Sequence, residues 1–478
     1  MPAAGVRHWA RIDPLNRENI ILSILVLGTM MGAIDATIVL LALPALTASL
    51  HSDLASTIWA IIIYLLVIAV TTTQFGRLGD IYGKGKLFNL GFGAFTLGSL
   101  LCGFSPSISA LIIFRVIQAV GGALMQANSG AIVADLFDAA RRGKAFGYIS
   151  FGWNMGAMIG IVLGGILTTF IGWRSIFFIN VPIGVVALAL GLIYIKDNVT
   201  ISDKVDLLGM GLLGTSLSLI SFGAINFASY GGSSSDAYII VSGMIGLCAF
   251  IAWERKAKSP MLHIEAFSNR VLSASILASL FQSLGFLSVT FILIMYLQGV
   301  RGLSPLIAAG LLIPGYLVSS MLSPKMGSLS YRFGARAVAT IGIALMGIAI
   351  IIYLTLGAES PYYVVVIGSV ISGLGGAMFW PANNSAVMSN AEPRQYGSIS
   401  GLLRLTSNIG ALGSYVIVIT AATLAVPRQL SFEIFIGTSK LTGGISDAFI
   451  NGIHAALLMS LSLLFIAAIL SVSRGKKR

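Results

Sequence analysis

Charged side chains are scarce in this sequence. Asp, Glu, Lys and Arg make up 10% of its 478 residues, whereas a soluble domain carries about 25%. Hydrophobic residues make up 56%, and the mean hydropathy is +0.94. Apolar runs long enough to cross a hydrocarbon core of about 30 Å recur from Ile20 almost to the C-terminus. The sequence therefore excludes a soluble protein and predicts an all-α integral membrane protein.

Cysteine and histidine are also rare. Cys102 and Cys248 lie in separate apolar segments, where small core residues are expected rather than a disulfide or a metal site. The four histidines are scattered without metal-ligand spacing: His8, His51, His263 and His454. We therefore predict no metal site.

Nucleotide-binding and catalytic motifs are missing as well. No GxxxxGK[ST] sequence occurs, which argues against a pump driven by ATP. Residues 209–214 (GMGLLG) fit GxGxxG, but they lie in an apolar segment and follow no strand, so a dinucleotide site is not expected. The sequence also lacks an assembled cluster of acid, base and nucleophile. We predict a protein that is not an enzyme, has no cofactor, and draws any driving force from an ion or solute gradient.

The apolar runs define fourteen predicted membrane spans, an even number that puts both termini on one side. They are 20–43, 56–76, 87–104, 107–130, 145–170, 174–195, 206–227, 237–253, 271–297, 305–323, 337–356, 362–385, 398–424 and 450–473. In the long connection before the last span, Phe432, Ile434 and Phe435 indicate either a small hairpin or a plain linker.

The net charge of +12 is distributed unevenly between the two sides of these spans. With the N-terminus inside, the inner segments hold four basic clusters: Arg77/Lys84/Lys86, Arg141/Arg142/Lys144, Arg255/Lys256/Lys258 and Arg474/Lys476/Lys477/Arg478. The outer segments hold only Arg174, Arg301, Arg428 and Lys440. This asymmetry follows the positive-inside rule. It predicts a multi-pass cell-membrane protein with both termini cytoplasmic and no nucleic-acid partner. We expect this protein to be a monomer in the bilayer.

A weak repeat divides the chain. The sequence GRLGDIYGKGK at 76–86 follows the second span, and a degraded copy, GSLSYRFGAR at 327–336, follows the tenth. Each copy comes after the second span of a six-helix unit. We therefore predict a six-helix bundle in residues 1–195, two inserted transmembrane helices with linkers in 196–265, and a second six-helix bundle in 266–478.

Asp35 interrupts the first apolar run. A charge near the bilayer centre costs at least about 2.5–3.5 kcal/mol unless it is paired, neutralised or hydrated, so an acid there indicates function. Helix rise puts Asp35 about 8 Å below the outer face, and Arg115 of the fourth span about 12 Å below it. If the two side chains face each other, protonation of Asp35 would release Arg115. We predict proton coupling through this pair, with a structural ion pair as the alternative.

The loop at 76–86 combines glycines that permit a tight turn with an acid and basic residues. Asp80 has two predicted kinds of partner, either Arg141 and Arg142 or a helix N-terminus, and would then be a breakable latch between helices. The alternative is a simple turn with anchoring charges. The predicted gating residues are Gly76, Asp80, Gly83, Lys84, Lys86, Arg141 and Arg142.

Glycines recur in the fifth span: Gly147, Gly156, Gly160, Gly164 and Gly165. Small residues about four positions apart form a face that lets another helix approach closely. The spacing alone favours a packing role.

With these residues assembled, the sequence resembles the major facilitator superfamily, and within it the fourteen-span drug:proton antiporter branch. The resemblance covers nearly the whole chain and is strongest over 28–184. The matching motifs are the loop at 76–86, the fourth-span set Arg115, Gln118, Gly121 and Gly122, the fifth-span glycines, WRSIFFINVPIG at 173–184, and IDATIVLLALP at 34–44. The sequence departs from the family pattern at Leu40, Ile81, Ala119 and Ile161, where asparagine, arginine, glycine and proline are usual.

The resemblance implies two six-helix bundles that rock around a midplane cavity. Candidate substrate-binding residues are Tyr64, Asn154, Met155, Gln282, Trp380, Asn383 and Arg404. Arg404 either extends to the cytoplasm or faces the cavity, where it would suit an anionic or amphipathic solute.

Two functions remain open from the sequence. The first is a proton-coupled secondary transporter that exports amphipathic small molecules, with the proton as coupling ion. The second is a facilitator or proton-coupled transporter of a specific metabolite or lipid. Ile161, which replaces the antiporter proline, favours this alternative, and Arg404 extends it to an anionic substrate.

Overall fold

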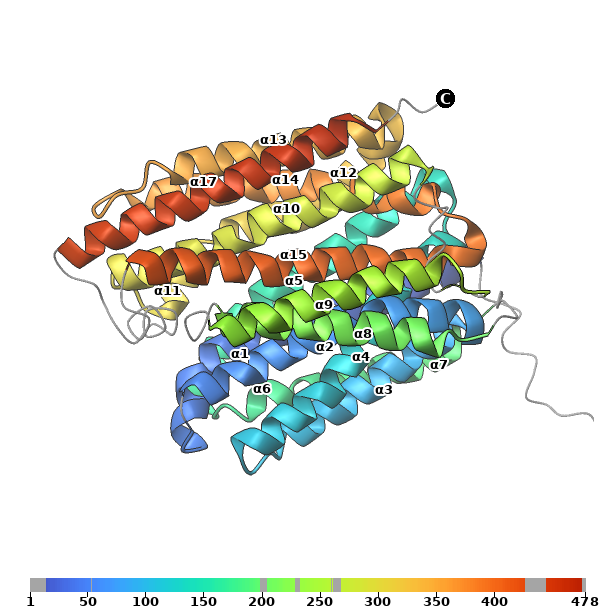
Figure 1. The fold of residues 1–478 in the computed structure, drawn as a ribbon, viewed down its shortest axis with the longest axis horizontal. Helices are drawn as coiled ribbons and strands as arrows, with labels where there is room; N and C mark the ends of the chain where they lie inside the picture. The colour runs from blue at the N-terminus through green and yellow to red at the C-terminus, as the bar shows by residue number, and fades with distance from the viewer. Residues whose placement is uncertain are drawn as a thin grey trace, which may run out of the picture.

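The computed structural model is all-helical, as the apolar runs predict. It describes residues 14–52, 54–197, 204–227, 233–258, 260, 268–425 and 444–474. Phe432, Ile434 and Phe435, the predicted hairpin or linker, lie outside these ranges. Figure 1 shows two groups of long helices side by side, blue to green for the N-terminal half and yellow to red for the C-terminal half.

The N-terminal half consists of α1 (Pro14–Ser49), α2 (Leu54–Tyr82), α3 (Lys84–Gly103), α4 (Ile108–Leu136), α5 (Ala139–Phe170), α6 (Ser175–Phe178) and α7 (Asn180–Tyr194). The predicted span 174–195 is interrupted, because α6 ends at Phe178 and α7 begins at Asn180. Pro182 explains the break, since a proline ring clashes with the carbonyl group four residues earlier, here that of Phe178.

The C-terminal half consists of α10 (Arg270–Met295), the π-helical turn η4 (Tyr296–Val300), α11 (Pro305–Gly310), α12 (Ile313–Phe333), α13 (Ala335–Tyr353), α14 (Tyr362–Ser389), the short η5 (Pro393–Gln395), α15 (Tyr396–Ala425) and α17 (Gly444–Val472). The predicted span 305–323 is also divided, into α11 and a longer α12. Pro314 lies in the first turn of α12, where the missing N–H costs little.

Between the halves, α8 (Leu207–Asn226) and α9 (Ser234–Glu254) form an antiparallel pair. Gly243 of α9 packs against Ser216 and Ile220 of α8, where an added Cβ would meet backbone atoms. α8 contacts α2 of one half and α15 of the other. The pair therefore lies beside the junction between the halves, in front of α2 in Figure 1.

The described residues hold twelve helices that are long and apolar enough to cross a membrane. The predicted spans 87–104 and 398–424 correspond to α3 and α15, which are helices of 20 and 30 residues but are not among the twelve. Lys84, Lys86, Asn89 and several glycines make α3 less apolar than its neighbours. The total of fourteen spans therefore stays a prediction.

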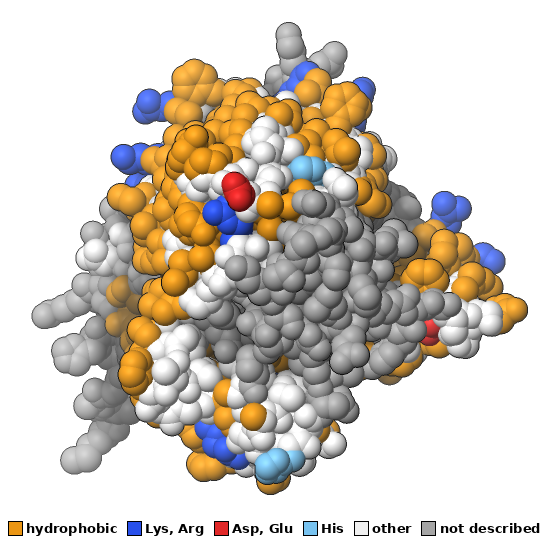
Figure 2. Space-filling model, turned by 90° about the vertical axis from the view of Figure 1, so that its left-hand side faces the viewer, with side chains coloured by type: hydrophobic (Ala, Val, Ile, Leu, Met, Phe, Trp, Pro, Cys, Tyr) orange, Lys and Arg blue, Asp and Glu red, His pale blue; other side chains and the backbone are white. Residues whose placement is uncertain are grey.

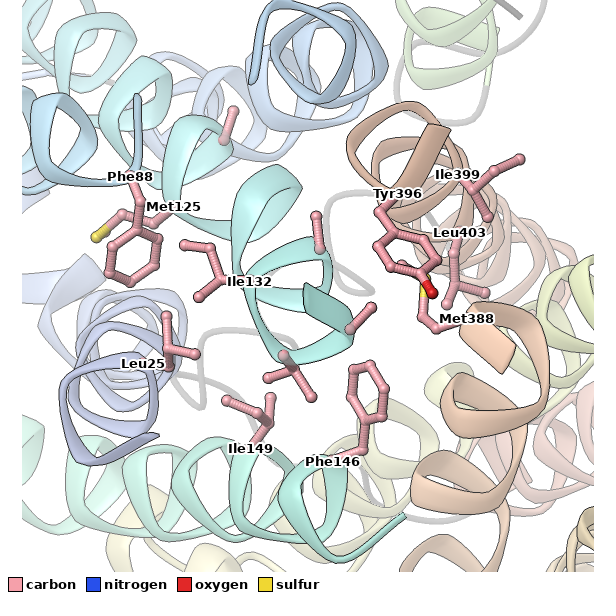
Figure 3. Close-up of a cluster of buried hydrophobic side chains, with 14 of the residues drawn as sticks. Leu25, Phe88, Met125, Ile132, Phe146, Ile149, Met388, Tyr396, Ile399 and Leu403 are labelled. Atoms are coloured by element: carbon pink, nitrogen blue, oxygen red, sulfur yellow. The ribbon is translucent and has the colours of Figure 1, made fainter. Parts of the chain in front are cut away.

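The halves meet at one end of the molecule, where α2 and α4 end and α5 and α15 begin. We call this the closed end. Figure 3 shows Phe88, Ile132 and Phe146 of the N-terminal half in one buried cluster with Tyr396 and Leu403 of α15. Figure 2 shows the opposite end, near α6 and α11, where carboxylates are few on the visible surface. The buried cluster joins the two halves at the closed end.

Candidate functional site

Asp35 on α1 and Arg115 on α4 form an ion pair inside the N-terminal half. Arg115 Nη1 donates to Asp35 Oδ2 at 2.6 Å and to Gln118 Oε1 at 2.7 Å. Gln118 Nε2 donates to the other carboxylate oxygen, Asp35 Oδ1, at 2.8 Å, and lies 2.8 Å from Ser99 Oγ. Asp35, Gln118 and Ser99 have no exposed surface, and Arg115 is 1% exposed. Both oxygens of this buried carboxylate therefore have donors, as a buried charge requires.

Arg115 also connects the pair to α2. Its Nε donates to the Ala60 carbonyl oxygen at 3.0 Å, and its guanidinium lies 4.2 Å from the centroid of the Tyr64 ring. Tyr64, a predicted cavity residue, is 2% exposed and belongs to this cluster instead. Nothing in the sequence pointed to Ser99 or Ala60, because a serine in an apolar helix and a backbone acceptor look ordinary.

The glycine face of α5 fixes the position of α1. An added Cβ at Gly156, Gly160 or Gly164 would meet, in turn, the carbonyl oxygens of Met30, Ile34 and Ile38, every fourth residue of α1. Thr37 Oγ1 also donates to the Ala157 carbonyl at 3.2 Å. Direct backbone contact of this kind requires glycine. Gly147 instead packs against Pro324 of α12, and Gly165 is only half-buried.

Asp80 near the end of α2 caps the N-terminus of α15. Its Oδ1 accepts from the Gly397 backbone N–H at 2.8 Å, and its Oδ2 accepts from the backbone N–H and Oγ of Ser398 at 2.8 and 3.0 Å. Of the two predicted kinds of partner for Asp80, the structure has the helix N-terminus. A carboxylate there satisfies free N–H groups and interacts favourably with the helix dipole.

Gly76 and Gly397 lie in direct contact where α2 crosses α15. A Cβ added to either glycine would meet the carbonyl oxygen of the other. Gly76, predicted to begin a loop, lies inside α2 instead, where the absence of a side chain allows the close helix crossing. Gly143 of α5 and Gly327 of α12 form the same reciprocal contact. Two of the helix contacts between the halves, α2 with α15 and α5 with α12, therefore depend on paired glycines.

Arg142 and Lys84 complete the closed end. Arg142 Nη2 donates to Tyr396 Oη at 2.8 Å and Nη1 donates to the Met388 carbonyl at 3.3 Å, so this arginine joins α5 to α14 and α15. Lys84 Nζ lies 2.7 Å from Asp135 Oδ2 and 3.7 Å from Asp80 Oδ1. Sequence reasoning missed Asp135 and Tyr396, which look like ordinary residues at helix ends.

The remaining predicted gating residues lie outside the contact between halves. Gly83 begins α3 with φ of 110°, a turn conformation that favours glycine. The backbone N–H of Lys86 donates to Asp197 at 3.0 Å, a cap of α3 that the sequence did not reveal. Arg141 pairs with Glu18 of α1 at 2.6 Å. These three residues organise the N-terminal half alone.

A pocket lies between the halves, next to the buried cluster at the closed end. Nine lining residues belong to α1, α3, α4 and α5, and one, Arg404, belongs to α15; the nine are Gly28, Thr29, Gly32, Phe88, Gly122, Met125, Gln126, Ser129 and Trp153. Arg404 therefore faces the pocket, one of the two orientations left open by the sequence. The sequence predicted Asn154 and Met155 as lining residues and not their neighbour Trp153. Successive residues of a helix point about 100° apart, so only one of these three side chains faces the pocket.

The other predicted substrate-binding residues do not line this pocket. Gln282 has no exposed surface and donates to Met346 Sδ at 3.3 Å inside the C-terminal half. Asn383 is equally buried and accepts from Arg474 Nη2 at 2.5 Å. Trp380 packs on Phe379, and Asn154 donates to the Ser150 carbonyl of its own helix at 2.7 Å. Met155 is half-buried on α5.

Two solved structures with a similar fold have titles that name transporters. The human organic anion transporter MFSD10 (TETRAN) matches with a TM-score of 0.62 at 14% identity, covering 94% of this chain and 99% of that one. A bacterial homologue of the iron transporter ferroportin in an outward-facing state gives the same TM-score, identity and coverage. At this identity the match concerns the fold alone.

Sequence relatives are similar over most of their length. The riboflavin transporter RibZ of Clostridioides difficile is 31% identical over 403 residues, 84% of this chain and 87% of the relative. The tetracenomycin C resistance and export protein of Streptomyces glaucescens is 29% identical over 424 residues, 88% of this chain and 79% of the relative. The multidrug resistance protein Stp of Mycobacterium tuberculosis is 28% identical over 484 residues, 92% of this chain and 89% of the relative.

The model of the Major Facilitator Superfamily matches residues 25–415, which include both the Asp35 pair and the contacts of the closed end. With its two helical halves and the RibZ relative above 30% identity, the chain belongs to the major facilitator superfamily of membrane transporters.

Proposed function

We propose that this protein is a proton-coupled secondary transporter that exports amphipathic compounds by alternating access. The observation that carries the proposal is the Asp35 carboxylate, which has no exposed surface and whose two oxygens are bound by Arg115 and Gln118. Protonation would remove the charge that holds Arg115, which is an energetic change large enough to alter helix packing. No group other than the coupling proton is required.

The proton site and the pocket share two helices, which gives the coupling a physical route. On α1, Gly32 lines the pocket and Asp35 lies three residues further, about 4.5 Å along the helix axis. On α4, Gly122 lines the pocket and Arg115 lies two turns away. A change in the Asp35 pair would therefore move helices that line the pocket.

We propose that both termini face the cytoplasm of a cell-membrane protein that acts as a monomer. The support for this orientation is the excess of basic residues in the connections at the closed end. The closed end is then the cytoplasmic gate, and Asp80 is its latch. Opening it would separate α2 from α15 and α5 from α12, while the other side closes.

The names of two relatives support the export proposal: one is a tetracenomycin C resistance and export protein and the other is a multidrug resistance protein. The riboflavin transporter supports the alternative, a transporter of one metabolite. One observation favours an anionic cargo for this alternative: Arg404 lines the pocket. The two functions differ in selectivity and in dependence on a proton gradient.

The test is transport in proteoliposomes with an imposed pH gradient, using fluorescent amphipathic compounds of each charge and an internal pH dye. We expect Asp35→Asn to abolish gradient-driven flux and substrate-dependent proton movement. The matched control is Asp138→Asn, which changes an acid that caps α5 away from the pocket. Gradient-driven flux that survives Asp35→Asn would refute the coupling role, and counterflow that needs no gradient in the wild type would favour a facilitator.

A further inference from the structure

The pocket between the halves holds a cation without a counter-charge. Arg404 is half-buried, and among the described residues its guanidinium has no hydrogen bond or ion pair. None of the ten lining residues carries a carboxylate. Arg115 and Arg142, by contrast, are each bound by several acceptors. Removing a cation from water without a partner is costly, so the pocket favours a negatively charged ligand.

The rest of the pocket lining suits an aromatic ligand. Phe88 and Trp153 contribute rings, while Gln126 and Ser129 contribute hydrogen-bonding groups. Trp153 is 41% exposed, an unusual degree for tryptophan next to a buried cluster. Apolar walls with a few placed polar groups are typical of small-molecule sites. A planar guanidinium binds a carboxylate through two parallel hydrogen bonds.

We propose that Arg404 binds the anionic group of an amphipathic aromatic substrate, with the ring system on the Trp153 side of the pocket. The proposal rests on the proposed transport function and names the charge class of its substrate. An organic anion replaces the missing counter-charge, whereas a lipophilic cation would add a second positive charge to the pocket.

The position of Arg404 also connects the ligand to the latch. Arg404 lies six residues beyond Ser398 on α15, about 9 Å along the axis from the residue that Asp80 binds. Every other lining residue belongs to the N-terminal half. A bound anion would therefore join α15 to the N-terminal half, as Asp80 does, and would favour the state in which the closed end is shut.

The experiment measures binding of three matched probes to the purified full chain by calorimetry: 2-naphthoate, neutral 2-naphthamide and cationic 2-naphthylmethylammonium. We expect the wild type to bind the carboxylate at least about tenfold more tightly than the amide, because a charged hydrogen-bond pair has that effect. Arg404→Gln should remove this preference while binding of the amide persists, and Arg404→Lys should keep part of it. The control is Arg394→Gln, which changes an exposed arginine before α15.

Equal or tighter binding of the amide or the cation by the wild type would overturn the proposal, as would an anion preference that Arg404→Gln leaves unchanged. The comparison of the three probes on the wild type tests the proposal even if Arg404→Gln fails to fold. Failure of the proposed function looks different: anion binding that needs Arg404, together with anion flux that ignores Asp35→Asn, would refute proton coupling and support the anion site. Proton-driven flux without any preference for the anion would support proton coupling and refute the anion site.

Discussion

Asp80 and Ser398 are 318 residues apart in the sequence, yet the Asp80 carboxylate accepts both the backbone N–H and the hydroxyl of Ser398, at 2.8 and 3.0 Å. One comes from the end of α2 and the other from the start of α15, so this contact joins the two halves of the transporter. It is polar and buried, with Asp80 2% exposed. A buried polar contact between the two halves resists their separation, because separating them would leave the carboxylate without its donors.

We expect Asp80→Asn to loosen the closed end. The amide loses the interaction with the α15 dipole and keeps only one acceptor oxygen, a loss of about 0.3–2 kcal/mol. Distances between spin labels on the ends of α2 and α15 should then show a several-fold larger separated population. The control is Asp138→Asn, which removes the charge of a helix cap that does not join the halves. An unchanged distance distribution in Asp80→Asn would contradict the latch.

We expect Gly397→Ala to hinder closure of the same end. The added Cβ meets the Gly76 carbonyl, a backbone atom that cannot turn aside, so α2 and α15 must separate. A cysteine placed at buried Ser400, with Cys102 and Cys248 replaced by serine, should react faster with a thiol reagent. Gly211→Ala is the control, because a Cβ on Gly211 meets nothing within 4 Å. Equal labelling rates in Gly397→Ala and its parent would refute the role of this crossing.

The Asp35 and Arg115 changes should be non-additive. Either Asp35→Asn or Arg115→Gln alone leaves a buried charge without its partner, at a cost of about 3–5 kcal/mol. Changing both removes both charges, so the double variant should be more stable than the sum of the single effects. Thermal unfolding of the four proteins in detergent measures this difference. Additive shifts in melting temperature would show that the pair does not act as a unit.

Arg474 offers a stability prediction in the C-terminal half. Its side chain is 1% exposed and binds Asn383 through Nη2, and within the part of the chain that the structure describes its Nε and Nη1 have no partner. Burial lowers the pKa of Arg474 to about 9. Replacing an under-satisfied buried cation by an apolar residue is often neutral or stabilising.

We therefore expect Arg474→Met, combined with Asn383→Leu to remove the orphaned amide, to keep or raise the melting temperature in detergent. Arg474→Met alone should lie between the wild type and the double variant. A fall of several degrees in the double variant would show that this cation is bound more favourably than its contacts indicate.

Sequence reasoning reached the Asp35 and Arg115 pair because depth in a membrane helix is a matter of counting residues. Gln118 matched a family motif, but its bond to the second oxygen of Asp35 depends on the rotation of α4 relative to α1. Tyr64 and Gln282 are predicted cavity residues that do not line the pocket, because helix rotation also decides where their side chains point. Polarity marks a side chain as notable, but the packing of neighbouring helices decides which way it points.

The sequence by itself determined that this protein lies in a membrane, that it is helical and that it has two halves. Hydropathy indicates the membrane, the length of the apolar runs indicates helices, and the repeated loop indicates the halves; each is a local property of the chain. It also singled out Asp80 as a candidate latch residue. Only the tertiary structure decided the partner of that latch, the orientation of Arg404 and the pairing of Gly76 with Gly397. Each of these depends on contacts between residues hundreds of positions apart, where a shift of one residue along a helix turns a side chain by about 100°.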